Sequence, residues 1–279
     1  MSYAAEISRS NPTCILIVVD QSGSMTDALG AGEAQLRKAD FLADVVNRTL
    51  QDLVLRCAKA EEIRNYFHVG LIGYGNSVGS AFSGALAGRG IVPISEVGEQ
   101  PARLENRSRK VPDGAGGLVD QVVRFPIWVE PTSNGGTPMC SALKDGRDLL
   151  SDWLKDHPSC FPPIVLHITD GESTDGDPRA SGAALHELRS SDGNVLLYNC
   201  HLSSQRANVV EYPTSPEALP NDFARTLFDM SSVLPVEFRK AAAELGRSLG
   251  EGARGFVFNA DAVSLVQFFD IGTRPSNLR

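Results

Sequence analysis

The sequence predicts an α/β protein with a doubly wound, mostly parallel central sheet and helices on both faces. Two apolar runs, Ile15–Val19 and Ile164–Ile168, have the continuous hydrophobicity of strands that are buried on both sides. Around them, segments with helical spacing of apolar residues alternate with further short apolar runs. Alternation of strands and helices is the pattern of a parallel sheet whose crossovers are helices.

The other elements are predicted from local periodicity. Apolar residues three or four positions apart predict helices, and short apolar runs bounded by turn residues predict strands. The predicted helices are 36–57, 139–154, a segment starting at Asp177-Pro178, 222–230, 236–249 and a segment from 261, and the additional predicted strands are 67–74, 125–129, 195–198 and 255–258.

We predict one principal domain at 13–270, preceded by an N-terminal segment, 1–12, and followed by a C-terminal tail, 271–279. Residues from about 76 to 124 are rich in glycine and poor in apolar residues, so we expect an insertion of small strands or loops rather than a second domain. A basic cluster, Arg103–Lys110, lies in it and contains Arg103, Arg107, Arg109 and Lys110 against Glu105. We expect these charges to be solvated, with docking of an acidic partner as the alternative.

Composition narrows the class of protein. The 279 residues carry a formal charge of −8, which argues against a surface devoted to nucleic acid or anionic lipid. The N-terminus lacks the apolar core of a signal peptide, and no apolar run approaches the roughly 18 residues that span a membrane. Five scattered cysteines without CxxC spacing favour reduced thiols. We therefore expect a cytoplasmic protein that binds neither nucleic acid nor membrane.

Oxygen-bearing side chains follow the first apolar run at every second position: Asp20, Ser22 and Ser24. Alternate side chains of an extended segment point the same way, so these oxygens can converge on one point. Carboxylates and hydroxyls are hard donors that suit Mg²⁺ or another hard divalent cation. Taken alone, the pattern could also be a helix N-cap or a tight turn.

Two later loops carry matching oxygens. Thr137 lies in Asn134-Gly135-Gly136-Thr137-Pro138, and Asp170 lies in Ile168-Thr169-Asp170-Gly171-Glu172. Each follows a predicted strand, and the carboxyl ends of parallel strands lie on one edge of a sheet. We therefore expect Asp20, Thr137 and Asp170 to meet there.

The three segments together resemble the signature of von Willebrand factor A (VWA) domains. Their metal-ion-dependent adhesion site (MIDAS) has Asp-x-Ser-x-Ser after the first strand, a Thr in a later loop and an Asp after a later strand. Here these positions are Asp20, Ser22, Ser24, Thr137 and Asp170, in order and unsubstituted. The resemblance runs from about Thr13 to Phe269, except for the insertion, and implies a Rossmann-like VWA fold.

The resemblance also implies a function. Ser22, Ser24 and Thr137 would contact Mg²⁺ (or Mn²⁺ or Ca²⁺) through hydroxyl oxygens, and Asp20 and Asp170 would act largely through water. Neutral hydroxyls leave the cation under-neutralised and one position open, which an Asp or Glu of a partner protein could fill. Such a site binds rather than catalyses, so we expect a protein-binding module and not an enzyme.

The same segments are similar to those of bacterial cytoplasmic VWA proteins, among them the tellurium-resistance-associated group. Some members of that group occur beside Ser/Thr kinases and phosphatases. The similarity implies a scaffold or regulator in a bacterial signalling or stress-defence system, with such a kinase or phosphatase as a candidate partner.

Two alternative functions remain. Gly75-Asn76-Ser77-Val78-Gly79 matches the Gly-x-Ser-x-Gly elbow of α/β-hydrolases, with Asp170 and either His186 or His201 in the right chain order for a triad. Alternatively, the metal site could serve structure alone. We interpret His68 and His167 as core histidines, and the segment around Asp175 and Asp177 as a turn.

Overall fold

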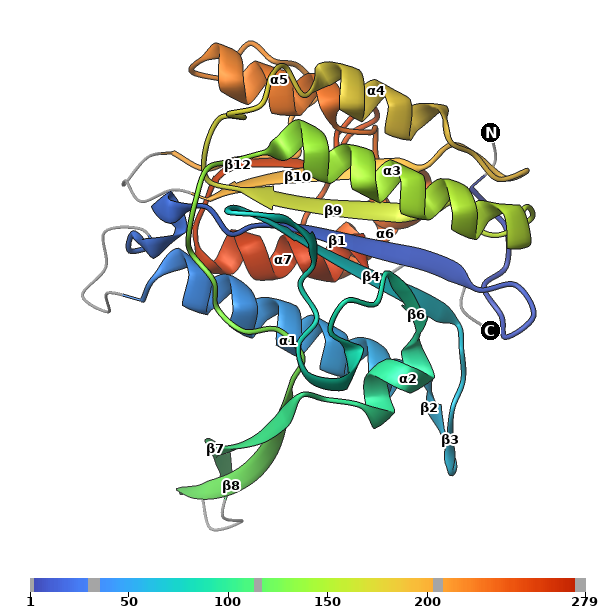
Figure 1. Cartoon of the computed structure of the whole chain (residues 1–279), viewed down its shortest axis with the longest axis vertical. Coiled ribbons are helices and arrows are strands. Elements are labelled where there is room, and N and C mark those ends of the chain that lie inside the picture. Colours follow the sequence, from blue (N-terminus) through green and yellow to red (C-terminus); the bar gives the residue numbers. More distant parts are fainter. Residues whose placement is uncertain (1–2, 30–35, 113–116, 203–207, 274–279) are drawn as a thin grey trace.

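The structure is a computed structural model, and it describes residues 3–29, 36–112, 117–202 and 208–273. A central sheet is flanked by two layers of helices (Figure 1). Within the described residues the sheet has eight strands in the order β11-β12-β10-β9-β1-β4-β5, with β6 also paired to β4. They are β1 Thr13–Asp20, β4 Phe67–Tyr74, β5 Val78–Ser80, β6 Ile91–Pro93, β9 Ile164–Thr169, β10 Leu196–Leu202, β11 Val210–Glu211 and β12 Phe256–Ala260.

The predicted fold class is confirmed. Strands β4, β1, β9, β10 and β12 are parallel to their neighbours in this series, whereas β5, β6 and β11 are short antiparallel additions at the edges. The sheet is thus mostly parallel and doubly wound. The strand order reverses at β1, which lies between β4 and β9.

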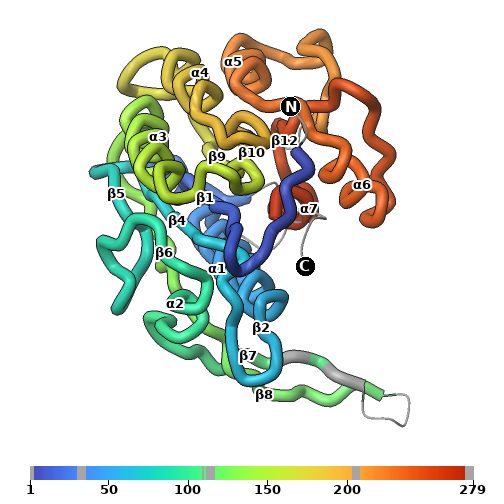
Figure 2. Tube along the Cα trace, turned by 90° about the vertical axis from the view of Figure 1, so that its right-hand side faces the viewer, coloured from blue at the N-terminus to red at the C-terminus, as the bar shows by residue number. Residues whose placement is uncertain are grey.

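Helices cover both faces of the sheet (Figures 1 and 2). One face carries α1 Lys38–Cys57, α6 Val236–Glu244 and α7 Ala262–Gly272, and the other carries α3 Met139–Asp156, α4 Arg179–Glu187 and α5 Asp222–Met230. Helix α2 Ile94–Glu99 lies beside α1, and two short 3₁₀ helices occupy Gly23–Thr26 and Gly84–Leu86. Helix α6 ends at Glu244, five residues before its predicted end at 249. Helix α7 ends at Gly272 and so extends past the predicted end of the domain at 270.

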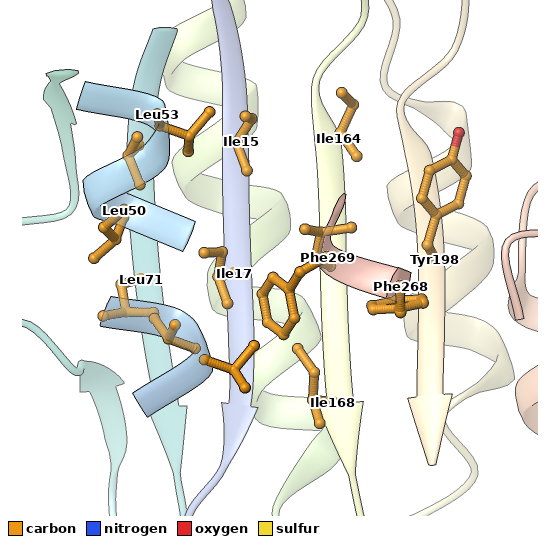
Figure 3. Close-up of a cluster of buried hydrophobic side chains, with 14 of the residues drawn as sticks. Ile15, Ile17, Leu50, Leu53, Leu71, Ile164, Ile168, Tyr198, Phe268 and Phe269 are labelled. Atoms are coloured by element: carbon orange, nitrogen blue, oxygen red, sulfur yellow. The ribbon is translucent and has the colours of Figure 1, made fainter. Parts of the chain in front are cut away.

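The alternation of side chains along β1 explains why its sequence is apolar throughout. Ile15, Ile17 and Val19 belong to the hydrophobic cluster under α1 and α7, while Leu16 and Val18 belong to the cluster under α3. Figure 3 shows Ile15 beside Leu53 of α1, and Ile17 between Leu50 of α1 and Phe269 of α7. Both faces of this central strand therefore lie in the core. No helix in the described part of the chain is long and apolar enough to cross a membrane.

Two hairpins lie outside the central sheet, one ahead of β4 and the other in the insertion. Strand β2 Ala58–Lys59 pairs with β3 Glu62–Ile63 ahead of β4, and within the insertion β7 Arg103–Pro112 pairs with β8 Leu118–Ile127. The β7–β8 hairpin projects from the body of the molecule (Figure 1). The charges of the basic cluster are partly paired: Arg107 lies over the Phe125 ring, 3.6 Å from its centroid, and forms ion pairs with Asp44 of α1 and with Glu105.

The strand predicted at 125–129 is correct for residues 125–127, which belong to a longer strand, and wrong for Trp128 and Val129. Phe125 and Ile127 end β8, which pairs with β7 instead of the central sheet. The next two residues are held by a side chain of α1, because Asn47 Oδ1 accepts hydrogen bonds from Trp128 N at 2.8 Å and Val129 N at 3.1 Å, and Asn47 Nδ2 donates to Val129 O at 2.9 Å. Asn47 thus satisfies backbone groups that a neighbouring strand would otherwise bond.

His167 is a buried histidine of β9, as predicted. Its Nδ1 donates to Asn199 Oδ1 at 2.8 Å, and its Nε2 accepts from the Tyr74 hydroxyl at 2.7 Å. Asn199 is fixed in that orientation because its Nδ2 donates to Leu227 O and Ser231 Oγ. Both ring nitrogens are therefore satisfied in the neutral form, and burial lowers the pKa of His167 from 6.5 to about 4.

His167 should make the fold sensitive to acid. Between pH 6.5 and 4 the unfolded chain binds a proton that the folded chain does not, so stability falls as the pH falls through this window. The loss amounts to about 3 kcal/mol. His167→Gln retains one acceptor and one donor without titrating, so its unfolding free energy should fall less over this range than that of the wild type. Denaturant unfolding across the range measures both slopes, and equal slopes would contradict the assignment.

Candidate metal centre

Four of the five predicted site residues, all but Thr137, lie at or just after the carboxyl ends of β1 and β9. Asp20 is the last residue of β1, and Asp170 directly follows β9. The two strands are parallel neighbours, and β1 continues toward α1 on one face of the sheet while α3 precedes β9 on the other. This is the point of strand reversal at which open α/β sheets bind ligands.

Asp20 organises the loop after β1 from a buried position. Its Oδ1 accepts a hydrogen bond from Ser22 N at 2.8 Å, and its Oδ2 accepts one from Thr169 Oγ1 at 2.8 Å. Burial raises the pKa of Asp20 to about 6, although the hydrogen bonds from Ser22 act in the opposite direction. Since both oxygens already bond the protein, Asp20 is placed to orient the loop.

A row of three oxygens connects the two strand ends. Ser22 Oγ lies 3.1 Å from Ser24 Oγ, and Ser24 Oγ donates to Asp170 Oδ1 at 2.7 Å. Adjacent ligands of an octahedral Mg²⁺ are about 2.9 Å apart, because the metal–oxygen distance is about 2.05 Å. Neighbouring oxygens of the row therefore have the separation that such a cation requires.

Thr137 reaches the same edge without a preceding sheet strand. Its segment is fastened to the Asp20 loop by hydrogen bonds from Gly23 N to Gly135 O at 3.0 Å and from Asn134 N to Gln21 O at 2.7 Å. Thr137 N also donates to Thr174 Oγ1 at 3.0 Å, and Thr174 N donates to Thr137 O at 2.9 Å. Backbone hydrogen bonds among three loops therefore position Thr137.

Two glycines permit this close approach. A Cβ on Gly135, whose φ is +83°, would lie 2.4 Å from Asn76 N, and a Cβ on Gly75 would lie 2.5 Å from Asn134 O. Neither neighbour is the movable end of a side chain. The backbones of the Gly75, Gln21 and Asn134 segments therefore pack together only because these positions have no side chain.

Asp175 caps a helix from a distant loop. Its Oδ1 accepts from Cys140 N and its Oδ2 from Ser141 N, each at 2.9 Å, at the first turn of α3. Burial raises the pKa of Asp175, but the hydrogen bonds from Ser141, Cys140 and Ser173 outweigh it and lower the pKa to about 2. This carboxylate fastens the loop after β9 to the helix that follows Thr137. Asp177 instead bonds Arg179.

Lys38, the first residue of α1, belongs to the site but was not among the residues predicted for it. Its Nζ lies 2.9 Å from Asp170 Oδ2 and 3.9 Å from Asp27 Oδ2, and its side chain is only 3% exposed. A cation at the amino end of a helix opposes the helix dipole. A lysine at the start of a predicted helix was therefore the available signal that a nearby anion holds it.

The donor chemistry fits a hard divalent cation. Hydrogen bonds join Asp20, Ser22, Ser24 and Asp170. Thr137 is 6% exposed, and its loop is hydrogen-bonded to the loop after β1 and to the loop after β9. The described residues contain no group of three or more His, Cys, Asp or Glu side chains that could hold a metal. A metal at this edge therefore depends on hydroxyl ligands, which are the donors that the sequence predicts.

The Gly75–Gly79 segment has the geometry of a hairpin turn. It connects β4 to the antiparallel strand β5, and Gly75 N donates to Ser77 O at 3.0 Å. A nucleophile elbow leads from a strand into a helix. Ser77 is exposed, while His186 Nε2 donates to Met230 O and His201 Nδ1 accepts from Asn259 N. The structure therefore brings no serine–histidine pair together at this motif in the described residues.

Comparison with known proteins gives likeness to solved structures alone. No protein-family model and no curated protein matches the chain. The vWF domain of the type V pili tip protein Mfa5 from Porphyromonas gingivalis matches with 13% identity and a TM-score of 0.32, over 58% of this chain and 39% of that one. The ArnB paralog VWA2 from Sulfolobus acidocaldarius matches with 12% identity and a TM-score of 0.34, over 72% and 37%. The PilB minor pilin from Streptococcus sanguinis matches with 14% identity and a TM-score of 0.34, over 58% and 30%. The chain thus corresponds to less than half of each of these proteins.

The two outer glycines of the Gly75–Gly79 motif provide a matched test of the site geometry. Gly75→Ala should destabilise the protein by about 2 kcal/mol or more, because its Cβ would contact two backbone oxygens. Gly79→Ala should change stability by no more than about 0.5 kcal/mol, because nothing lies within 4 Å of its Cβ. Denaturant unfolding measures both, and equal costs would contradict the packing of these loops.

Proposed function

We propose that the chain is a metal-dependent protein-binding module. Ser22, Ser24 and Thr137 would supply hydroxyl ligands to Mg²⁺, or to Mn²⁺ or Ca²⁺, and Asp20 and Asp170 would orient them and supply negative charge. When bound, the cation would act as a Lewis acid that accepts a carboxylate oxygen. The guest is an Asp or Glu side chain of a partner protein.

The observation that carries this proposal is the row of oxygens from Ser22 through Ser24 to Asp170. The hydroxyl oxygens of Ser22 and Ser24 are 3.1 Å apart, a spacing that suits adjacent ligands of an octahedral cation, and Asp170 Oδ1 holds Ser24 Oγ from the neighbouring strand end at 2.7 Å. The proposed ligands in this row are hydroxyl groups, which carry no charge. A divalent cation bound to them would therefore keep a strong preference for an additional anion.

The setting that we propose rests on the resemblance and on the cysteines. All five cysteines are free thiols, in agreement with a reducing cytoplasm. The similarity to bacterial tellurium-resistance-associated proteins supports a scaffold or regulator in a signalling or stress-defence system. A Ser/Thr kinase or phosphatase of the same system would be a suitable partner.

The first test is metal-dependent stability. Mg²⁺ or Mn²⁺ at about a hundredfold excess over its dissociation constant should stabilise the wild type by about 2.7 kcal/mol. Asp20→Ala should remove this effect, because the loop that carries Ser22 and Ser24 loses its buried anchor. Asp177→Ala is the matched control: its carboxylate is exposed and, among the residues that the structure describes, bonds Arg179 alone, so the shift should remain. An undiminished shift in Asp20→Ala would refute the site.

The second test separates a binding site from a purely structural metal. Partner proteins recovered on the immobilised wild type should be lost when EDTA is added, and Thr137→Ala should lose the same proteins. If EDTA and Thr137→Ala lower the melting temperature but leave the recovered proteins unchanged, the metal serves the fold alone.

A further inference from the structure

We infer that Lys38 is a fixed cation that tunes the site: it weakens metal binding and strengthens the preference of the bound metal for a carboxylate guest. This inference rests on the proposed function and assigns a role to a residue outside the predicted ligand set. It concerns the net charge at the ligands rather than their geometry.

The position of Lys38 is specific. Asp170 bridges two partners, since its Oδ1 accepts from Ser24 Oγ at 2.7 Å and its Oδ2 bonds Lys38 Nζ at 2.9 Å. A single carboxylate, that of Asp170, therefore separates the Lys38 ammonium from the hydroxyl groups of Ser24 and Ser22. The side chains of Lys38 and Asp170 are 3% and 0% exposed, so solvent screens this pair little.

Lys38 stabilises the ligand loops in the absence of metal. An uncompensated buried carboxylate is strongly unfavourable, and the Lys38 ammonium supplies the balancing charge for Asp170. Because the other Asp170 oxygen holds Ser24, this ion pair also fixes the hydroxyl row. The ligands are thereby kept together before any divalent cation binds.

The same charge opposes a divalent cation. Asp20 and Asp170, when ionised, contribute two negative charges, which would balance a divalent cation completely. Lys38 adds one positive charge, so Asp20, Asp170, Lys38 and the cation together carry a net charge of about +1 before a guest arrives. Asp27, 3.9 Å from Lys38 Nζ, is 62% exposed, so solvent screens its charge. Removal of the Lys38 charge should therefore strengthen metal binding and weaken the attraction for an anionic guest.

These opposite signs distinguish tuning from a structural ion pair. If Lys38 only supported the fold, its replacement would loosen the ligand loops, and affinity for metal and affinity for a carboxylate would fall together. If Lys38 acts through its charge, its replacement raises the affinity for metal and lowers the affinity of the bound metal for a carboxylate.

The experiment compares the full chain with Lys38→Gln and Lys38→Arg. Gln keeps a hydrogen-bond donor for Asp170 Oδ2 but removes the charge, and Arg keeps the charge. Mn²⁺ binding is titrated by electron paramagnetic resonance, in sodium acetate and in sodium chloride of equal ionic strength, with Asp20→Ala to correct for metal bound elsewhere. Melting temperatures are measured with and without Mn²⁺.

Lys38→Gln should bind Mn²⁺ at least about tenfold more tightly than the wild type. It should melt at a lower temperature without metal, gain more from Mn²⁺, and show a smaller increase in Mn²⁺ affinity from acetate. Lys38→Arg should resemble the wild type. If Lys38→Gln folds only with Mn²⁺, the metal has replaced the internal cation, and the inference is supported.

Other outcomes overturn it. Equal or weaker Mn²⁺ binding by Lys38→Gln, with normal binding by the wild type, refutes the role of Lys38 and leaves the metal site intact. Failure of Lys38→Gln to fold with or without Mn²⁺ also counts against it. If neither the wild type nor Lys38→Gln binds Mn²⁺, the proposed function fails together with this inference.

Discussion

The hydrogen bond from Ser24 Oγ to Asp170 Oδ1 joins the ends of β1 and β9, and the organisation of the site depends on it. One partner is anchored through the Asp20 loop and the other through the ion pair with Lys38. The bond is short because the two strands are parallel neighbours whose carboxyl ends share one edge of the sheet. Packing in the core fixes the two strands relative to each other, because every residue of β1 and β9 is buried.

The features that the sequence could predict are those encoded by local patterns. The apolar runs of β1 and β9, the limits of β4, and the place of Asp20 and Asp170 at strand ends all follow from hydrophobicity and from the geometry of parallel sheets. The hydrogen bonds among Asp20, Ser22, Ser24 and Asp170 agree with the expectation that these residues converge. Their binding of metal remains a prediction.

The features that escaped prediction depend on contacts between distant segments. Residues 125–129 have the composition of a strand, but Asn47 of α1 bonds Trp128 and Val129 and ends the pairing. In the Gly-x-Ser-x-Gly motif, position 75 requires glycine because its backbone meets that of the Asn134 segment, a contact that no local pattern reveals. Lys38 pairs with Asp170, and Asp175 bonds the first turn of α3, so both contact residues far away in the sequence. The local sequence shows that these two side chains are charged but not which groups they bond.

The crossing of glycine backbones at positions 75 and 135 has a consequence for recognition. No space remains there for a side chain, so these loops have little conformational freedom once the chain has folded, and a guest of the proposed site would meet a surface that is already ordered. A preorganised receptor loses little entropy on binding. Natural or engineered changes of guest are therefore best accommodated in the side chains around the rim, because the turns that carry the oxygens tolerate no remodelling.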